Sequence, residues 1–297
     1  MKYKGLSLSI GSLQRQYGDR DALSMARDAG FDAVDMNVCY YGQGKQPDVY
    51  AMEREEFRDY FRAVRRHAEE IGIAVGQIHG LTGSYFPEEE RNVQLRLVGQ
   101  RGIEATALLG ASLCVNHCVS TFQWGWGATD EAMHAANQAM YADLIPLAEE
   151  FGVKILLESF GGVTVDGRRG TDHFADSEKM LAEYEALPTE NKAFCLDSGH
   201  ANVGAGYGLA SLGEHVRLFG SRIQALHLHD NDGMNDQHLF PGQGNINWPE
   251  LFRALEEIRY AGYVNYELRL PFGREAKYSL PFLGRYLRAF TETNGAV

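Results

Sequence analysis

Short apolar runs alternate along the chain with longer segments in which apolar residues recur at the spacing of a helix. The apolar runs predict eight β-strands, over residues 5–10, 31–38, 73–79, 113–119, 154–158, 193–197, 223–229 and 263–268. The longer segments predict helices over residues 21–29, 52–71, 88–109, 130–151, 177–186, 209–219, 248–259 and 277–291. Several of these helices stop at a glycine that precedes the next strand, as is typical of α/β units.

Eight strand–helix repeats favour a closed barrel over an open sheet. A chain of 297 residues suits two ordinary domains or a single α/β barrel. No linker, low-complexity tract or change of composition divides the sequence. We therefore expect an α/β fold with one domain, a (β/α)8 TIM barrel that spans residues 1–297.

Six successive predicted strands, from the third to the eighth, end in histidine or acidic residues, although strands buried on both faces should be apolar. The residues at or just beyond these ends are His79, His117, Glu158, Asp197, His200, His227, His229 and Glu267. In a barrel the carboxyl ends of all strands meet at one face, so these side chains would surround one pocket. Unpaired carboxylates in such a pocket are costly without a cation, and the set therefore predicts a metal site.

The segment after the seventh strand adds Asp236 and His238, which are possible ligands of an additional metal. A solvated polar loop is the alternative for this segment, and a hydrogen-bonded core residue is the alternative for any single histidine. Trp124, in the loop after the fourth strand, would shield the pocket or pack in an apolar loop. Arg269, two residues after Glu267, would bind an acidic group of a substrate.

Composition narrows the classes of partner and location. The formal net charge is −12 and no Lys/Arg-rich run occurs, so we expect no nucleic-acid partner. No apolar stretch reaches 18 residues, so we expect no membrane span, and the first residues lack the features of a signal peptide. These observations predict a cytoplasmic protein with reduced cysteines. The oligomeric state stays open, a homo-oligomer included.

Seven segments resemble the sugar phosphate isomerase/epimerase superfamily, which has a xylose isomerase-like TIM barrel and also contains endonuclease IV-type enzymes. The most specific of them is a D-x-H motif followed by PG-x-G. The segments are QIHG at 77–80, VNHC at 115–118, LLES at 156–159, CLDSGH at 195–200, HLHDND at 227–232, DQHLFPGQGNINW at 236–248 and YEL at 266–268. They extend from the third to the eighth predicted strand.

The resemblance implies specific roles for these residues. The four ligands of a single divalent metal in the sugar-converting members match Glu158, Asp197, His229 and Glu267. His227 is an alternative to His229. In the sugar-converting members, the counterpart of His200 holds substrate hydroxyls, and in the endonuclease branch it binds a second metal. Further ligands of that branch's trinuclear zinc cluster match His79, His117, Asp236 and His238.

One position departs from the pattern of the psicose and tagatose epimerases. These enzymes carry an arginine six residues beyond the ligand of the seventh strand, where this chain has Asn235. The departure puts that way of gripping a ketose in doubt, and with it the identity of the sugar.

A site of three carboxylates and one imidazole predicts Mn²⁺, with Mg²⁺, Co²⁺ or Zn²⁺ as alternatives. Glu158 and Glu267 would act as the catalytic acid–base pair that moves a proton on a sugar carbon. The predicted function is that of a divalent-metal-dependent sugar isomerase or epimerase that works through a metal-stabilised enediolate. Substrate binding would involve His200, His227, His79, His117, Trp124 and Arg269.

Three other functions fit the same residues. A lyase or dehydratase would act on a keto sugar or an inosose, including cleavage of a 3-keto glycoside, through the same enolate chemistry. An endonuclease IV-type phosphodiesterase would use the larger ligand set. A carbohydrate-binding barrel without catalysis is the last alternative. In the leading hypothesis the partner is a small sugar or sugar derivative.

Overall fold

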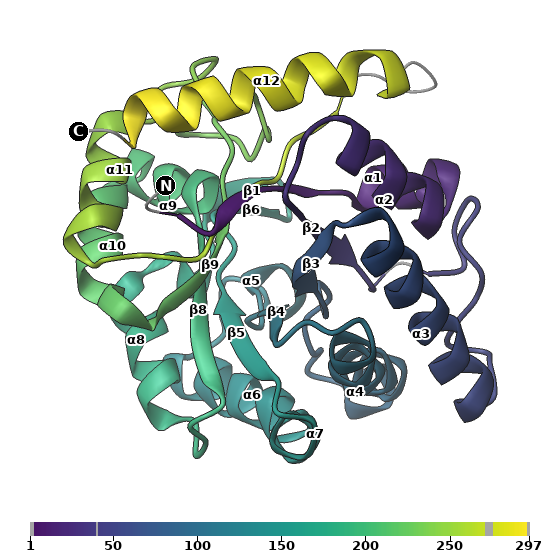
Figure 1. Cartoon of the computed structure of the whole chain (residues 1–297). Coiled ribbons are helices and arrows are strands. Elements are labelled where there is room, and N and C mark those ends of the chain that lie inside the picture. The colour runs from purple at the N-terminus through teal and green to yellow at the C-terminus, as the bar shows by residue number, and fades with distance from the viewer. Residues whose placement is uncertain (1–2, 40, 271–275, 296–297) are drawn as a thin grey trace.

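Eight parallel strands form the centre of the molecule and helices surround them in the computed structural model, which describes residues 3–39, 41–270 and 276–295 (Figure 1). Neighbouring strands pair in the order β10-β1-β2-β3-β4-β5-β8-β9. Their bounds are Gly5–Ser9 for β1, Ala33–Asn37 for β2, Ala74–His79 for β3, Leu113–His117 for β4, Lys154–Glu158 for β5, Lys192–Asp197 for β8, Ile223–His227 for β9 and Tyr263–Tyr266 for β10.

The sheet closes into a barrel between β9 and β10, the two strands at the ends of this order. Leu228, just beyond β9, forms a parallel bridge with Tyr266 of β10. The backbone N–H of Leu228 donates to the carbonyl of Asn265 at 3.0 Å, and the N–H of Glu267 donates to the carbonyl of Leu228 at 3.0 Å. The predicted (β/α)8 TIM barrel is therefore confirmed, with all eight strands at the predicted places.

The helices differ from the predictions mainly in where they break. The segment 130–151 forms two helices rather than one, and Pro146 stands in the first turn of the second, where its missing N–H does no harm. The main helices are α2 (Asp19–Asp28), α3 (Arg54–Ile71), α4 (Asn92–Leu108), α6 (Asp130–Ala142), α7 (Ile145–Phe151), α8 (Ser177–Ala186), α10 (Leu212–Phe219), α11 (Trp248–Glu257) and α12 (Ala276–Asn294). Three shorter helices were not predicted: α1 (Gly11–Tyr17), α5 (Thr121–Trp124) and α9 (Ser198–Gly206). Among the described helices, none combines the length and the apolar character that a membrane crossing requires.

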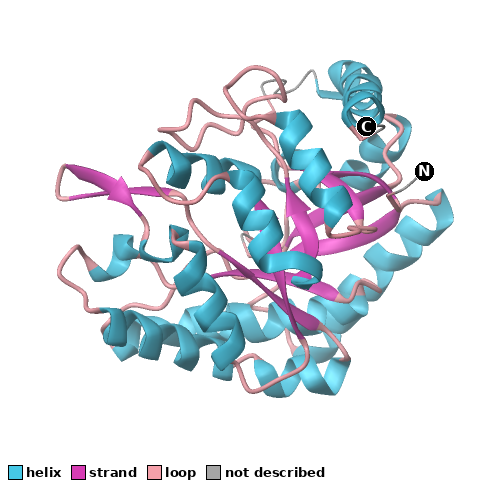
Figure 2. Cartoon of the chain, turned by 90° about the vertical axis from the view of Figure 1, so that its left-hand side faces the viewer, coloured by secondary structure: helices cyan, strands magenta, loops and turns pink. Residues whose placement is uncertain are grey.

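An antiparallel hairpin that the sequence analysis missed projects from the body as an arm (Figure 2). It consists of β6 (Gly162–Val165) and β7 (Arg168–Thr171), joined by Asp166 and Gly167. Both turn residues have positive φ, 50° and 75°, as a tight hairpin turn requires. The guanidinium of Arg169 donates to the carbonyl of Met234 and to Asn235 Oδ1, so the arm contacts the loop after β9.

The barrel interior changes character along the strands. Before the polar ends of the strands, four neighbouring strands contribute a small cluster of buried apolar residues: Val115, Leu156, Ala193, Cys195 and Ala225. A larger apolar core lies between the sheet and the helices. Apolar contacts therefore stabilise the barrel away from the carboxyl ends of the strands, where the polar residues gather.

A buried carboxylate fastens α1, α2 and α3 to the loop after β2. Asp19 accepts hydrogen bonds from the hydroxyls of Tyr41 at 2.6 Å and Tyr60 at 2.8 Å, and from Gln14 Nε2 at 3.0 Å. The pKa of Tyr41 is raised well above its ordinary value by burial and then by Asp19, so its hydroxyl stays protonated and donating. These bonds hold the segment 41–46 beside α1.

We expect Asp19→Ala to destabilise the protein, because buried donors left without an acceptor cost about 1–3 kcal/mol each. Asp21→Ala is the matched control, since Asp21 is exposed on the same helix, and it should change the free energy of unfolding by no more than about 1 kcal/mol. Denaturant unfolding of both variants measures the difference. Equal stabilities would show that the Asp19 network contributes nothing.

Candidate metal centre and active site

A cavity of about 550 Å³ opens at the carboxyl ends of the strands. Histidines and carboxylates from seven positions line it: Asp35, His79, His117, His200, Asp236, His238 and Glu267. Glu158, Asp197, His227 and His229 are buried beside these residues. The structure thus brings together every acidic and imidazole residue that the sequence analysis proposed for the site.

One group of side chains surrounds Glu158. Its Oε1 lies 2.7 Å from His227 Nδ1, and its Oε2 lies 3.2 Å from His117 Nε2. The rings of His79 and His117 face each other through their Nε2 atoms at 3.2 Å. Glu267 joins the group, with Oε2 3.5 Å from His227 Nδ1 and Oε1 3.4 Å from His79 Nδ1. Glu158 and Glu267 therefore approach the same nitrogen of one imidazole.

A second group surrounds Asp197 and Asp236. His229 Nε2 lies 3.1 Å from Asp197 Oδ1 and 3.6 Å from Asp236 Oδ1. His200 approaches the same two carboxylates, with Nδ1 3.7 Å from Asp197 Oδ1 and Nε2 3.5 Å from Asp236 Oδ2. His238 Nε2 lies 3.3 Å from Asp236 Oδ2. Asp236 is thus shared by three imidazoles.

The CLDSGH segment builds the Asp197 part of the site from local interactions. Asp197 ends β8 and caps α9 by accepting from the backbone N–H of His200 at 2.7 Å. The hydroxyl of Ser198 donates to the carbonyl of His229 and accepts from its N–H, which fixes the end of β9. A Cβ atom on Gly199 would lie 1.9 Å from Cε1 of His229, so only glycine leaves room for that ring.

Asp230 organises the loop that carries Asp236 and His238. Its carboxylate accepts from the N–H groups of Gly242 at 2.8 Å and Ile246 at 3.2 Å, and from Trp248 Nε1 at 3.1 Å. These bonds curl the PGQG segment back over β9. His238, at a φ of 50°, then stacks on His229 with ring centroids 3.9 Å apart. The carboxylate of Asp230 therefore forms its hydrogen bonds within this segment.

Burial and mutual attraction set the charges of the site. Burial raises the pKa of Glu158, but the charge and hydrogen bond of His227 lower it by more, so the net shift of the pKa is downward and the group is a carboxylate at neutral pH. Burial likewise opposes the shift in Glu267, whose pKa is held well below its ordinary value mainly by His227. Burial lowers the pKa of His117 to about 4, so its ring is neutral and can donate a lone pair.

Several buried polar atoms in the site make no hydrogen bond within the described residues. They are Asp35 Oδ1, His117 Nδ1, Glu158 Oε2, His200 Nδ1 and His229 Nδ1. Such atoms are rare in folded proteins, and a bound ligand or another function would account for them. Oxygen and imidazole nitrogen donors also lie within 4.8 Å of one another in several groups, including His79–His117–Glu158, Asp197–His200–His229 and His229–Asp236–His238. The donor set fits a divalent metal.

Of the two remaining predicted substrate-binding residues, one lines the cavity and the other does not. Arg269 lines the cavity at its exposed rim. Trp124 does not belong to the described lining, and its Nε1 donates to the carbonyl of Tyr85 at 2.9 Å, as expected for a packed loop. Phe160 supplies an aromatic face to the cavity instead, with its ring stacked on His117 at 4.2 Å.

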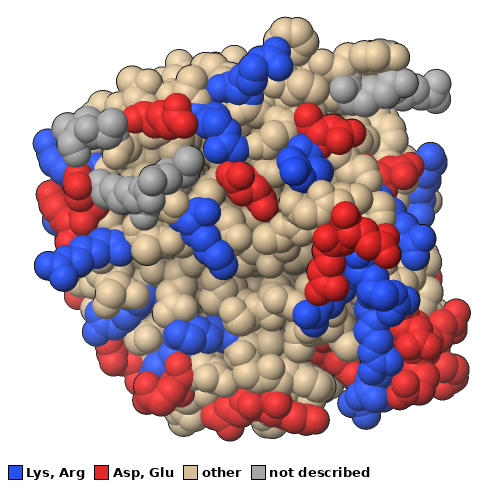
Figure 3. All heavy atoms as spheres, viewed as in Figure 1, with Lys and Arg blue, Asp and Glu red and all other residues tan. Residues whose placement is uncertain are grey.

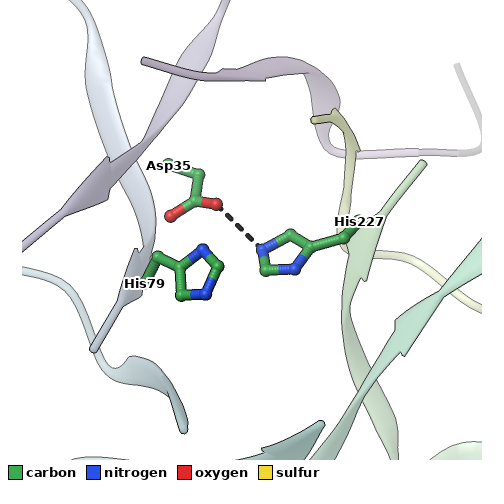
Figure 4. A group of neighbouring side chains, drawn as sticks. All are labelled: Asp35, His79 and His227. Atoms are coloured by element: carbon green, nitrogen blue, oxygen red, sulfur yellow. Dashed lines mark hydrogen bonds and ion pairs between the residues drawn. The ribbon is translucent and has the colours of Figure 1, made fainter. Parts of the chain in front are cut away.

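The sequence analysis also missed Arg15 and Asp35, which line the cavity from α1 and β2. Asp35 converges with His79 and His227 in the barrel interior (Figure 4). The signal for Asp35 was present, because it is an acidic residue in an otherwise largely apolar strand. Strand alternation made it look like an outward-facing residue, as it would be in a sheet with one solvated face.

We expect Gly199→Ala to destabilise the protein by about 1–3 kcal/mol, because the added methyl group overlaps the His229 ring. Backbone entropy alone predicts the opposite sign, a gain of about 0.5–1 kcal/mol for alanine in a helix. Gly127→Ala is the control, since its Cβ would meet nothing within 4 Å. Thermal unfolding decides the sign, and a stabilised Gly199→Ala variant would contradict the contact.

Comparisons with known proteins agree with this geometry. The chain is 31% identical over 156 residues to the uncharacterized protein MJ1311 of Methanocaldococcus jannaschii, a match that covers 52% of this chain and only half of that relative. The fold is similar to that of D-psicose 3-epimerase in the presence of D-fructose, with a TM-score of 0.73 and 13% identity over 99% of this chain and 100% of the other. It is also similar to that of IolI protein with a bound zinc atom, with a TM-score of 0.74 and 18% identity over 98% of both chains.

The structural neighbours named here thus include a sugar epimerase and a zinc-bound protein, and at these identities they establish the fold alone. The stronger match is to a family as a whole. Residues 23–285 match the family described as the xylose isomerase-like TIM barrel. The chain belongs to the xylose isomerase-like TIM barrel family.

Proposed function

We propose that this protein is a divalent-metal-dependent sugar isomerase or epimerase. The observation that carries the proposal is the position of Glu158 and Glu267, two ionised carboxylates that approach the same imidazole nitrogen at the base of an open cavity. Buried polar atoms of Glu158, His200 and His229 make no hydrogen bond among the described residues and are available to a ligand. Similarity to sugar epimerases of the same fold supports the choice of substrate class.

Glu158, Asp197, His229 and Glu267 would hold the ion, and His227 is the alternative nitrogen donor. We favour Mn²⁺ for this oxygen-rich set, with Mg²⁺, Co²⁺ or Zn²⁺ as alternatives. When bound, a divalent ion supplies polarisation of a substrate carbonyl, which makes the neighbouring C–H acidic. Asp236 and His238, with His200, would hold an additional ion.

Glu158 and Glu267 would transfer the proton. Both carboxylates have lowered pKa values, so both are ionised at neutral pH and either can accept a proton from a sugar carbon. The product of that step is an enediolate. In an aldose–ketose interconversion, the carboxyl group that took the proton would return it to the neighbouring carbon. Epimerisation would need a proton on the other carboxyl group, which that group would take up from solvent and deliver to the opposite face of the same carbon.

The walls of the cavity would orient the sugar. His79, His117 and His200 offer ring nitrogens to hydroxyl groups, and Phe160 offers an apolar face. The bottom of the cavity is closed to solvent at His227 and His229, which are fully buried. Asn235, at the position of the arginine of the psicose and tagatose epimerases, is a neutral amide and supplies no cation; it is hydrogen-bonded to Arg169 and Asp232.

A metal-dependent phosphodiesterase is the second candidate, and the group of His200, Asp236 and His238 favours it because it extends the ligand set beyond one ion. Charge argues against this candidate. Basic and acidic side chains are interspersed on the face shown in Figure 3, and the run of basic side chains at its lower right is flanked by acidic ones. The net charge of −12 points the same way. A lyase acting on a keto sugar or an inosose would use the same carboxylates, and product analysis distinguishes it.

We expect Glu158→Gln to slow solvent-deuterium exchange into a substrate by about 100-fold or more, because the amide cannot accept the proton. The measurement uses NMR in D₂O with Mn²⁺ and a panel of ketoses, keto sugars and inososes. Glu190→Gln is the control, since Glu190 is exposed and lies outside the cavity lining. Exchange at the wild-type rate in Glu158→Gln would remove this residue from the base role.

Removal of divalent metal should lower the thermal stability of the protein, because a ligand that binds only the folded state adds about 2.7 kcal/mol at a concentration of 100 Kd. Thermal unfolding in EDTA and after addition of Mn²⁺ measures the shift. Asp197→Asn serves as the comparison, and its unfolding temperature should respond little to Mn²⁺. Identical unfolding of the wild type in EDTA and in Mn²⁺ would contradict the metal site.

A further inference from the structure

Asp35 is a fully enclosed carboxylate in the middle of β2, with 1% of its surface exposed. Its Oδ2 accepts a hydrogen bond from Ser9 Oγ at 2.7 Å and lies 2.9 Å from His227 Nε2. Figure 4 shows the carboxylate directed at the His227 ring across the barrel interior. Residues 192 positions apart in the sequence are thereby joined.

His227 is constrained on both edges and on one face. Its Nε2 faces Asp35, and its Nδ1 lies 2.7 Å from Glu158 Oε1. The His79 ring stacks on it with centroids 4.8 Å apart. With none of its surface exposed, the imidazole has no room to turn.

The connections form one chain of hydrogen bonds that crosses the barrel. Asn265 Nδ2 donates to Ser9 Oγ at 3.0 Å, and Ser9 donates to Asp35. The chain continues from Asp35 through His227 to Glu158. Five strands contribute one residue each, namely β10, β1, β2, β9 and β5.

The chain of hydrogen bonds ends at Oε1 of Glu158. Oε1 is held by His227, whereas Oε2 is buried without a hydrogen bond among the described residues. The apolar cluster just below shows that hydrocarbon side chains can fill this barrel. Because buried charges are a poor source of stability compared with such packing, a function in orientation accounts better for the chain.

We infer that Asp35 is a positioning residue that acts through His227 to hold Glu158 Oε1, and so fixes the orientation of the carboxylate that would bind the ion. The inference rests on the function proposed above for Glu158. Groups that orient a metal ligand from behind commonly change metal affinity about 10- to 100-fold when they are removed. Asp35 would therefore contribute to metal binding without contacting the metal.

The test compares Asp35→Ala, Asp35→Asn and the exposed control Asp48→Ala by titration calorimetry with Mn²⁺. We expect Asp35→Ala to weaken Mn²⁺ binding about 10- to 100-fold. Asp35→Asn should recover most of the affinity, because an amide still forms a hydrogen bond with the imidazole. Asp48→Ala should bind as the wild type does. Wild-type affinity in Asp35→Ala would overturn the inference.

A measurement without metal separates this inference from the proposed function. In the metal-free protein, the N–H proton between His227 and Glu158 should give a downfield, slowly exchanging NMR signal, assigned by its loss in His227→Gln. We expect Asp35→Ala to abolish the signal and Asp35→Asn to retain it. Persistence of the signal in Asp35→Ala would overturn the positioning role. Absence of Mn²⁺ binding by the wild type would instead contradict the proposed function and leave this result standing.

Discussion

Compensation of buried charge at the carboxyl end of the barrel is the constraint on which the site depends. Glu158 and Asp197 are almost completely enclosed, and ionised carboxylates in such places require partners. Each has imidazoles on two sides, and three of these four imidazoles, those of His200, His227 and His229, meet a second carboxylate. Compensation within the protein is incomplete, because ring nitrogens and carboxylate oxygens stay without hydrogen bonds. A cation would complete it.

Barrel closure is what makes this arrangement possible. The ligand-type residues are spread from β2 to β10, and only a closed ring of parallel strands brings their ends to one place. Short loops then refine the geometry. Hydrogen bonds of Ser198 fix the backbone at His229, and those of Asp230 fix the loop that carries Asp236. The backbone positions of these two site residues are therefore set by neighbouring residues.

Much of the fold followed from the sequence because periodicity reports which faces are buried. All eight barrel strands, and helix 177–186, lie where the apolar pattern placed them. Helix α9 was missed because its segment SGHANVGAG contains three glycines, which disfavour a helix, yet Asp197 caps it and Ala201 and Val203 pack inside. The β6–β7 hairpin was missed although Asp166 and Gly167 are a recognised turn pair.

The site was predicted in its acidic and imidazole residues, which strand ends reveal, but less well in its walls. Trp124 was expected at the cavity for its chemistry, whereas Phe160 lines it because of its position after β5. Asp35 is the exception among the acidic residues. It stood out in a largely apolar strand, but its role could not be assigned because that role depends on His227, which is remote in sequence. Local patterns cannot report contacts that only tertiary structure creates.

The β6–β7 arm has a consequence for how this barrel could diversify. It is inserted between β5 and α8, adds no strand to the central sheet and reaches the loop beside Asp236 through Arg169. Because none of its residues is among those that line the cavity, the arm can change in length and side chains without replacing the histidines and carboxylates of the site. Insertions in this part of the chain can therefore accumulate independently of the residues at the strand ends.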